Sequence, residues 1–127
     1  MKQATIEWLS RAEGDWKVAR REMEAPDPVY NVVCFLAPQC AEKCLKAVLE
    51  EYGVAFAKTH DLVVLLDLMA GRLPGLEELR QDIAYLTPFA IAGRYPGMEA
   101  GPDTAAAALR IAGEVRRASH QILGWQP

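Results

Sequence analysis

The sequence predicts an all-α protein built as an up-and-down bundle of about four to five helices. Apolar residues recur every three or four positions through most of the 127 residues, which is the spacing that lines one face of a helix. The alternation typical of strands does not extend over any useful length. Because the length is that of one domain, we expect residues 1–127 to form a single helical domain.

The first long helix is expected over residues 4–24, where apolar residues lie at steps of three and four. Pro26 and Pro28 end it, because a proline ring cannot continue the hydrogen-bond ladder. The second is expected over residues 29–52 and is apolar around more than half of its circumference, as in a helix packed on two sides. Gly53 stands just after its end, where a left-handed residue commonly closes a helix.

Two short helices are expected over residues 61–70 and 76–86, and a last long helix over residues 103–123, closed by Gly124. Between them, the stretch Thr87–Gly101 carries prolines and glycines that interrupt regular structure. We expect it to be an irregular loop, and loops of this length in compact domains are often functional.

Charge and hydropathy restrict the classes of protein that fit. The formal net charge of -3 argues against the simplest form of nucleic-acid binding, which depends on clustered Lys and Arg. The longest uncharged stretch, residues 28–41, is 14 residues long and too short to span a bilayer. Charged residues also interrupt the start of the chain, so we expect a cytoplasmic protein that does not enter a membrane.

Three cysteines, Cys34, Cys40 and Cys44, lie close together on the second predicted helix. Their odd number argues against a disulfide framework, and we expect buried, reduced thiols. A metal site would need further ligands, and His60 and His120 are the two histidines of the chain. We therefore expect neither a metal nor a cofactor.

The polar stripe of the second helix, Gln39, Glu42, Lys43 and Lys46, is its most distinctive chemistry. One interpretation is a solvated face on which Glu42 and Lys46 form an ordinary surface pair. The alternative is a binding site. Lys43 and Lys46 would then hold the phosphate of a nucleotide or RNA, or Gln39 and Glu42 would contact a partner.

A second group of candidates, Lys58, Thr59 and His60, precedes the predicted helix 61–70. Either Thr59 or Asp61 can cap that helix, and we expect His60 to take part in local hydrogen bonding and capping. Alternatively, Lys58, Thr59 and His60 form an anion site, because backbone amides at a helix amino terminus attract phosphate.

Aromatic residues supply the remaining candidates. Arg94 and Tyr95 place a cation beside a ring on the predicted loop, which suits either stacking on a base or locking the loop. Trp8, Trp16 and Trp125 are interpreted as core or interface packing.

Several of these residues combine into a familiar pattern. The run Gln39-x-x-Glu42-Lys43-x-x-Lys46, the downstream Thr59-His60-Asp61-Leu62 and the later Arg94-Tyr95-Pro96 together closely resemble the HEPN domain family, over nearly the whole chain. The resemblance implies a compact helical bundle that is usually dimeric. It also implies a partner, because such domains are often encoded beside a minimal nucleotidyltransferase in toxin and antitoxin pairs.

Many members of the family are metal-independent ribonucleases that use an Arg and a His separated by four to six residues. Here Arg116 and Arg117 precede His120 with three and two residues between, so the motif is not present at that spacing. Arg116 and His120 still share a helix face, which leaves a weak catalytic pair possible. The other interpretation is that Arg116, Arg117 and His120 decorate the solvated side of the last helix near its carboxyl end.

These observations favour a non-catalytic HEPN-like binding module that dimerises, partners a nucleotidyltransferase and binds a nucleotide or RNA. The first alternative is a HEPN ribonuclease toxin of a toxin–antitoxin pair, with catalysis by Arg116 and His120. The second is a structural assembly subunit.

Overall fold

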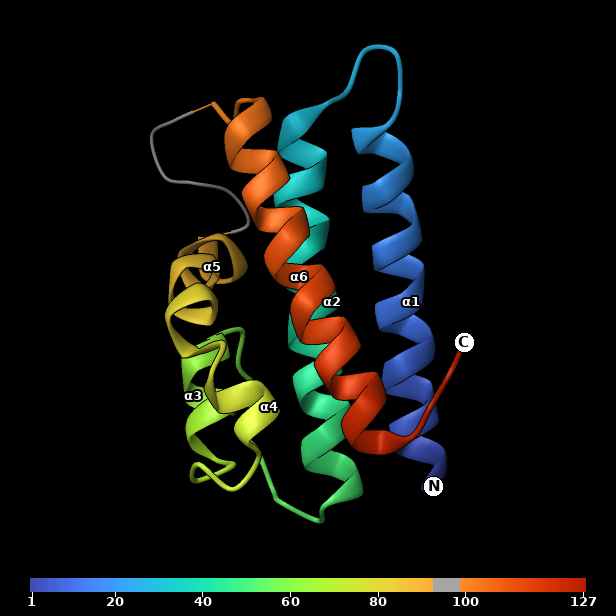
Figure 1. The fold of residues 1–127 in the computed structure, drawn as a ribbon, viewed down its shortest axis with the longest axis vertical. Helices are drawn as coiled ribbons and strands as arrows, with labels where there is room; N and C mark the ends of the chain where they lie inside the picture. Colours follow the sequence, from blue (N-terminus) through green and yellow to red (C-terminus); the bar gives the residue numbers. More distant parts are fainter. Residues whose placement is uncertain (93–98) are drawn as a thin grey trace.

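The computed structural model describes residues 1–92 and 99–127, and in this part of the chain every regular element is a helix, which confirms the all-α prediction. Three long helices lie side by side, and three shorter ones cover one side of them (Figure 1). The helices are α1 (Gln3–Met23), α2 (Tyr30–Glu51), α3 (Leu62–Asp67), α4 (Pro74–Glu77), α5 (Arg80–Ala92) and α6 (Pro102–Leu123).

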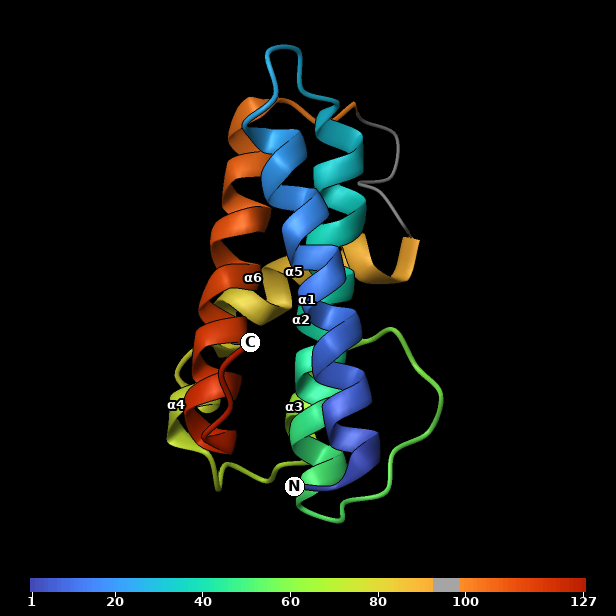
Figure 2. The same ribbon diagram turned by 90° about the vertical axis from the view of Figure 1, so that its right-hand side faces the viewer.

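Helix α2 lies at the centre of the bundle. It packs most extensively against α1, which runs antiparallel to it, and against α6, which runs in the same direction as α2 (Figures 1 and 2). The short helices α3 to α5 return the chain along the bundle, and α3 and α5 also contact α2. Thirteen of the 22 residues of α2 are consequently buried.

The core is built largely from small side chains on α2 and from leucines on the short helices. Cys34, Cys40 and Cys44 are 0 to 1% exposed, which confirms the predicted buried thiols, and all three are free. Burial raises the pKa of Cys34 above its ordinary value, so this thiol stays protonated. Within the described ranges, no helix is both long enough and apolar enough to span a bilayer.

Glycine closes two of the long helices, as predicted. Gly53 follows α2 with a φ of 68°, and Gly124 ends α6 with a φ of 63°. The amide of Val54 then donates to the carbonyl of Leu49 at 2.9 Å, which satisfies a group left unpaired by the helix end.

The predicted boundary at Pro88 is wrong. Instead of one helix over residues 76–86, the structure has the short α4 and a separate α5, which continues through Pro88 to Ala92. The first part of the predicted loop Thr87–Gly101 is therefore helical. Residues 93–98 lie outside the described residues.

Burial of the next side chain explains how α5 passes Pro88. Pro88 has no N–H to donate to the carbonyl of Ala84. The hydroxyl of Thr87 donates to the neighbouring carbonyl of Ile83 at 3.0 Å, so it does not replace this bond. Phe89 follows directly and is 1% exposed, so its burial stabilises a helical conformation on the far side of Pro88. Burying such a side chain contributes about 1.5–3 kcal/mol, enough to offset most of the roughly 3 kcal/mol penalty of an internal proline.

Gly113 on α6 is required by a close approach between α1 and α6. A Cβ atom at this position would lie 2.8 Å from Cη2 of Trp16. We expect Gly113→Ala to lower the free energy of unfolding by about 1–3 kcal/mol, because Trp16 must move, even though alanine favours the helix. Urea unfolding measures this change.

Gly14 on α1 is the matched control, because a Cβ atom there meets nothing within 4 Å. Gly14→Ala should raise the free energy of unfolding by about 0.5–1 kcal/mol. Equal effects of the two substitutions would contradict the close contact between Gly113 and Trp16.

Candidate functional site

Three charged or titratable side chains meet beside α2 and form the Glu42 cluster, defined as Glu42, Lys46 and His60. Nζ of Lys46 donates to Oε2 of Glu42 at 3.0 Å, and Nδ1 of His60 lies 2.9 Å from Oε1 of the same carboxylate. Glu42 is 6% exposed and Lys46 5%. Nζ of Lys46 also lies 5.3 Å from the centre of the Trp8 ring, so the cation is held by a carboxylate and an aromatic face.

His60 is the solvent-facing member of the Glu42 cluster, with 63% of its side chain exposed. An ionised carboxylate can only accept hydrogen bonds, so we assign the shared proton to Nδ1 of His60. In the neutral ring this assignment leaves Nε2 as an acceptor that can face a ligand. The Glu42 carboxylate thus fixes both the orientation and the tautomer of an exposed imidazole.

A groove of about 310 Å³ runs between this part of α2 and the carboxyl end of α5. Its volume lies at the lower end of the range usual for small-molecule sites. The residues that α5 contributes are apolar, whereas α2 contributes both polar residues and Phe35. Phe35 and Ile91 are 48% and 57% exposed. The lining includes Phe35, Gln39, Glu42, His60, Phe89 and Ile91.

The interpretation of the α2 stripe as a solvated face is wrong for Glu42 and Lys46, because α2 is covered on most sides and both residues are buried. Lys43 is half-buried and forms an ion pair with Asp15 of α1. Gln39 lies at the groove and donates to the carbonyl of Phe35 at 3.3 Å. Both predicted phosphate-binding lysines are therefore paired with carboxylates in this structure.

In the segment before α3, Asp61 caps the helix, as one of the two predicted alternatives had it, but His60 does not take part in the capping. Asp61 is the cap, since its side chain accepts from the amides of Val63 and Val64 at 3.0 and 3.2 Å. Thr59 supports it by accepting from the Asp61 amide at 3.1 Å. The expectation that His60 serves local capping is wrong, because His60 reaches across to Glu42. Lys58 is exposed.

A second charged group, the Glu13 cluster, joins α1 to α6 and comprises Glu13, Arg116 and His120. The guanidinium of Arg116 binds both carboxylate oxygens of Glu13, with Nε donating to Oε2 at 2.9 Å. Nε2 of His120 lies 3.8 Å from Oε2 of Glu13. Trp16 stacks on Arg116 at 5.3 Å, and Trp125 meets the ring of His120 edge-on at 4.9 Å.

The prediction of a solvated Arg116 and His120 is therefore wrong, since their side chains are 19% and 12% exposed. Arg117, by contrast, is exposed. Burial lowers the pKa of His120 below its ordinary value of 6.5, and the positive charge of Arg116 lowers it further, while Glu13 opposes both effects. Within residues 1–92 and 99–127, Nε2 of His120 and Oγ of Ser119 are buried and have no hydrogen-bond partner.

Sequence reasoning missed Glu13, although a signal was present. Glu13 lies four residues after Leu9 and three before Trp16, so it falls on the apolar face of α1. Arg116 stands in the same relation to Ala112 and Ser119 on α6. Opposite charges at the edges of two apolar faces that must pack together could have indicated an ion pair between the helices.

The structure brings Gln39, Glu42, Lys46 and His60 together at or beside one groove. It places Arg116 and His120 in the separate Glu13 cluster. Arg94 and Tyr95 lie outside the described residues. All three tryptophans are half-buried, and each lies against a charged or titratable side chain of one of the clusters.

The fold and this arrangement define an all-helical module with a groove of mixed polar and apolar lining beside its central helix. The model of the HEPN domain matches residues 5–122, and the chain therefore belongs to the HEPN domain family. Membership supports a module related to nucleotides or RNA. No curated protein and no solved structure matches the chain.

The lowered pKa of His120 predicts a pH-dependent stability. The unfolded chain binds a proton more readily than the folded one, so the contribution of neutral His120 is fully present above pH 6.5. It is lost as the pH falls from there through the lowered pKa of the folded state. Urea unfolding between pH 8 and pH 5, roughly the range of histidine titration, should show this decline.

The variant His120→Gln cannot take up this proton, so its stability should fall less steeply over the same pH interval. Parallel curves for the two proteins would show that His120 does not cause the decline.

Proposed function

We propose that this chain is a non-catalytic, cytoplasmic HEPN module that forms a homodimer, pairs with a nucleotidyltransferase and holds a nucleotide or RNA in the groove beside the Glu42 cluster. The observation that carries the proposal is the exposed imidazole of His60, which the buried Glu42 carboxylate fixes at the wall of a groove large enough for a small ligand.

The groove offers the types of group that recognise a base. Gln39 carries both an acceptor and donors, and Nε2 of His60 accepts in the neutral ring and donates when protonated. Phe35, which is 48% exposed, supplies an aromatic face on which a base can stack. These groups suit the edge and face of an unstacked base better than they suit a duplex.

Charge also favours the base as the recognised part. Lys43 and Lys46 are neutralised by Asp15 and Glu42, so neither is a free cation for a phosphate. Lys58 is exposed close to His60 in the sequence and is the better candidate for a phosphate contact. Arg94 and Tyr95 stay candidates from the sequence.

The condition of the Arg116 and His120 pair supports a non-catalytic module over the ribonuclease alternative. Arg116 is bound by Glu13, and Nε2 of His120 is buried. A ribonuclease needs its base and its cation beside the ribose hydroxyl and the phosphate, and here both groups face a carboxylate between helices. RNA cleavage that is lost in His120→Ala would contradict this proposal.

Ligand binding is tested by titrating the protein with the four nucleoside 5′-monophosphates and with short single-stranded RNA in a calorimeter. His60→Ala should weaken binding by roughly tenfold, which is the upper end of the net contribution of one hydrogen bond. Because the His60 side chain is 63% exposed, this variant should still fold, which thermal unfolding checks.

Gln39→Ala should also weaken binding, and Gln81→Ala is its matched control, because Gln81 is an exposed glutamine on α5 outside the groove lining. The assignment of the groove would be overturned if none of the nucleotides or RNAs bound, or if the wild type and His60→Ala bound them with equal affinity.

Assembly is a separate prediction. Sedimentation velocity should give twice the chain mass of 14.0 kDa for the isolated protein. The reading frame beside this gene should encode a small nucleotidyltransferase, and coexpression should yield a complex of the two proteins. A monomer, or a neighbouring protein of another class, would contradict this part. A stable dimer that binds neither ligand nor nucleotidyltransferase would favour the structural subunit.

A further inference from the structure

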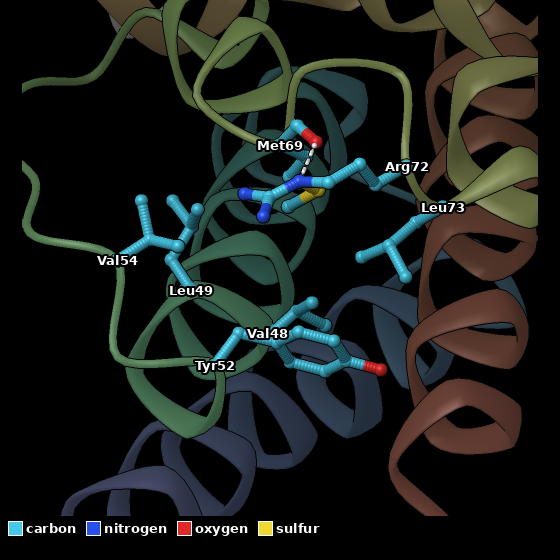
Figure 3. A pocket seen from close by; sticks show the side chains of 7 residues that line it. All are labelled: Val48, Leu49, Tyr52, Val54, Met69, Arg72 and Leu73. Atoms are coloured by element: carbon cyan, nitrogen blue, oxygen red, sulfur yellow. Dashed lines mark hydrogen bonds between the residues drawn. The ribbon is translucent and has the colours of Figure 1, made fainter.

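A second pocket lies at the carboxyl end of α2, beyond the Glu42 cluster along the same helix. It has a volume of about 100 Å³. In the view of Figure 3, Arg72 and Met69 lie across the pocket from Val48 and Tyr52, with Val54 and Leu73 on two flanks. None of these residues belongs to the groove proposed for the nucleotide or RNA.

The inner surface of this pocket is apolar. Val48, Leu49 and Met69 are 0, 1 and 3% exposed and form part of the core, whereas Tyr52 at the rim is 53% exposed. An apolar surface of this kind favours an apolar group of matching size, because burial of that group removes apolar area from water.

A guanidinium stands at the mouth of the pocket. Nε of Arg72 donates to the carbonyl of Met69 at 3.2 Å, and the backbone amide of Arg72 donates to the same carbonyl at 3.1 Å. Within the described residues no carboxylate pairs with Arg72. Its two terminal nitrogens therefore have donors available for an anion, in the planar arrangement that suits a carboxylate.

The turn that carries Arg72 has an unusual backbone. Ala70 has a φ of 53° and Gly71 a φ of 68°, so two successive residues are left-handed, and one of them has a side chain. Such a conformation is disfavoured for alanine and persists where the surrounding structure holds it. Here the left-handed turn places Arg72 beside Met69, where its Nε and its backbone amide both donate to the carbonyl of Met69.

We propose that this pocket binds a small aliphatic carboxylate, with a branched alkyl chain against Val48, Leu49 and Met69 and the carboxylate on the guanidinium of Arg72. The volume favours a short apolar group, because it is about a third of that of the groove beside the Glu42 cluster. The two linings share no residue, so the site is independent of the proposed nucleotide or RNA groove.

The test uses 4-methylpentanoate as the probe and 4-methylpentan-1-ol as its uncharged counterpart. In saturation-transfer NMR on the full chain, the acid should bind and the alcohol should bind roughly tenfold more weakly, because the alcohol cannot form a charged pair with Arg72. No binding of the acid, or equal binding of the acid and the alcohol, would overturn the proposal.

Variants then locate the site. Arg72→Gln should weaken binding of the acid roughly tenfold, while Arg11→Gln, which removes an exposed guanidinium from α1, should leave it unchanged. Val54→Phe places a larger side chain at the flank of the pocket and should abolish binding while leaving Arg72 in place. Acid binding that survives both Arg72→Gln and Val54→Phe would exclude this pocket as the site.

Discussion

The burial of α2 is the constraint on which the rest of the structure depends. Helices α1 and α6 pack along it, and α3 and α5 contact it as well, so a charge on most of its surface loses contact with water. Removing an ion from water costs several kcal/mol unless a partner and further hydrogen bonds compensate it. Glu42 and Lys46 satisfy each other, and His60 satisfies the second oxygen of the carboxylate. The packing of the bundle therefore determines the geometry of the groove wall.

The same constraint acts between α1 and α6, where it pairs charged side chains with one another. Glu13 binds Arg116 through both carboxylate oxygens, and His120 is enclosed by this pair and by Trp125. Arg116 and His120 lie one helical turn apart, closer than in the ribonuclease motif, and both lie against Glu13 at a helix interface. Chemistry that requires these groups at a substrate would first have to break a partly buried ion pair, which is costly because it leaves a charge without its partner.

Periodicity predicted the helices because the core needs one apolar face per helix, and residues such as Leu9, Ala12 and Trp16 mark that face directly. It failed at Pro88, where burial of Phe89 offsets the local penalty of the proline. Periodicity also could not show that Glu42 and Lys46 are buried, because their burial results from the packing of other helices against α2. His60, which contacts Glu42, lies 18 residues further along the chain. The motif named Glu42, Lys46 and His60 as candidates, whereas their pairing is a property of the tertiary structure.

The charge balance of the groove decides what kind of ligand it can distinguish. The charge of Glu42 is compensated by Lys46 before a ligand arrives, so the groove wall offers directed hydrogen bonds and little net field. In the proposed binding mode, selection depends on the positions of the donors and acceptors of Gln39 and His60. A binding mode based on phosphates would instead need free cations, which the pairing of Lys43 and Lys46 removes. The net charge of -3 fits the proposed binding mode, because recognition of a base does not depend on electrostatic attraction to a phosphate backbone.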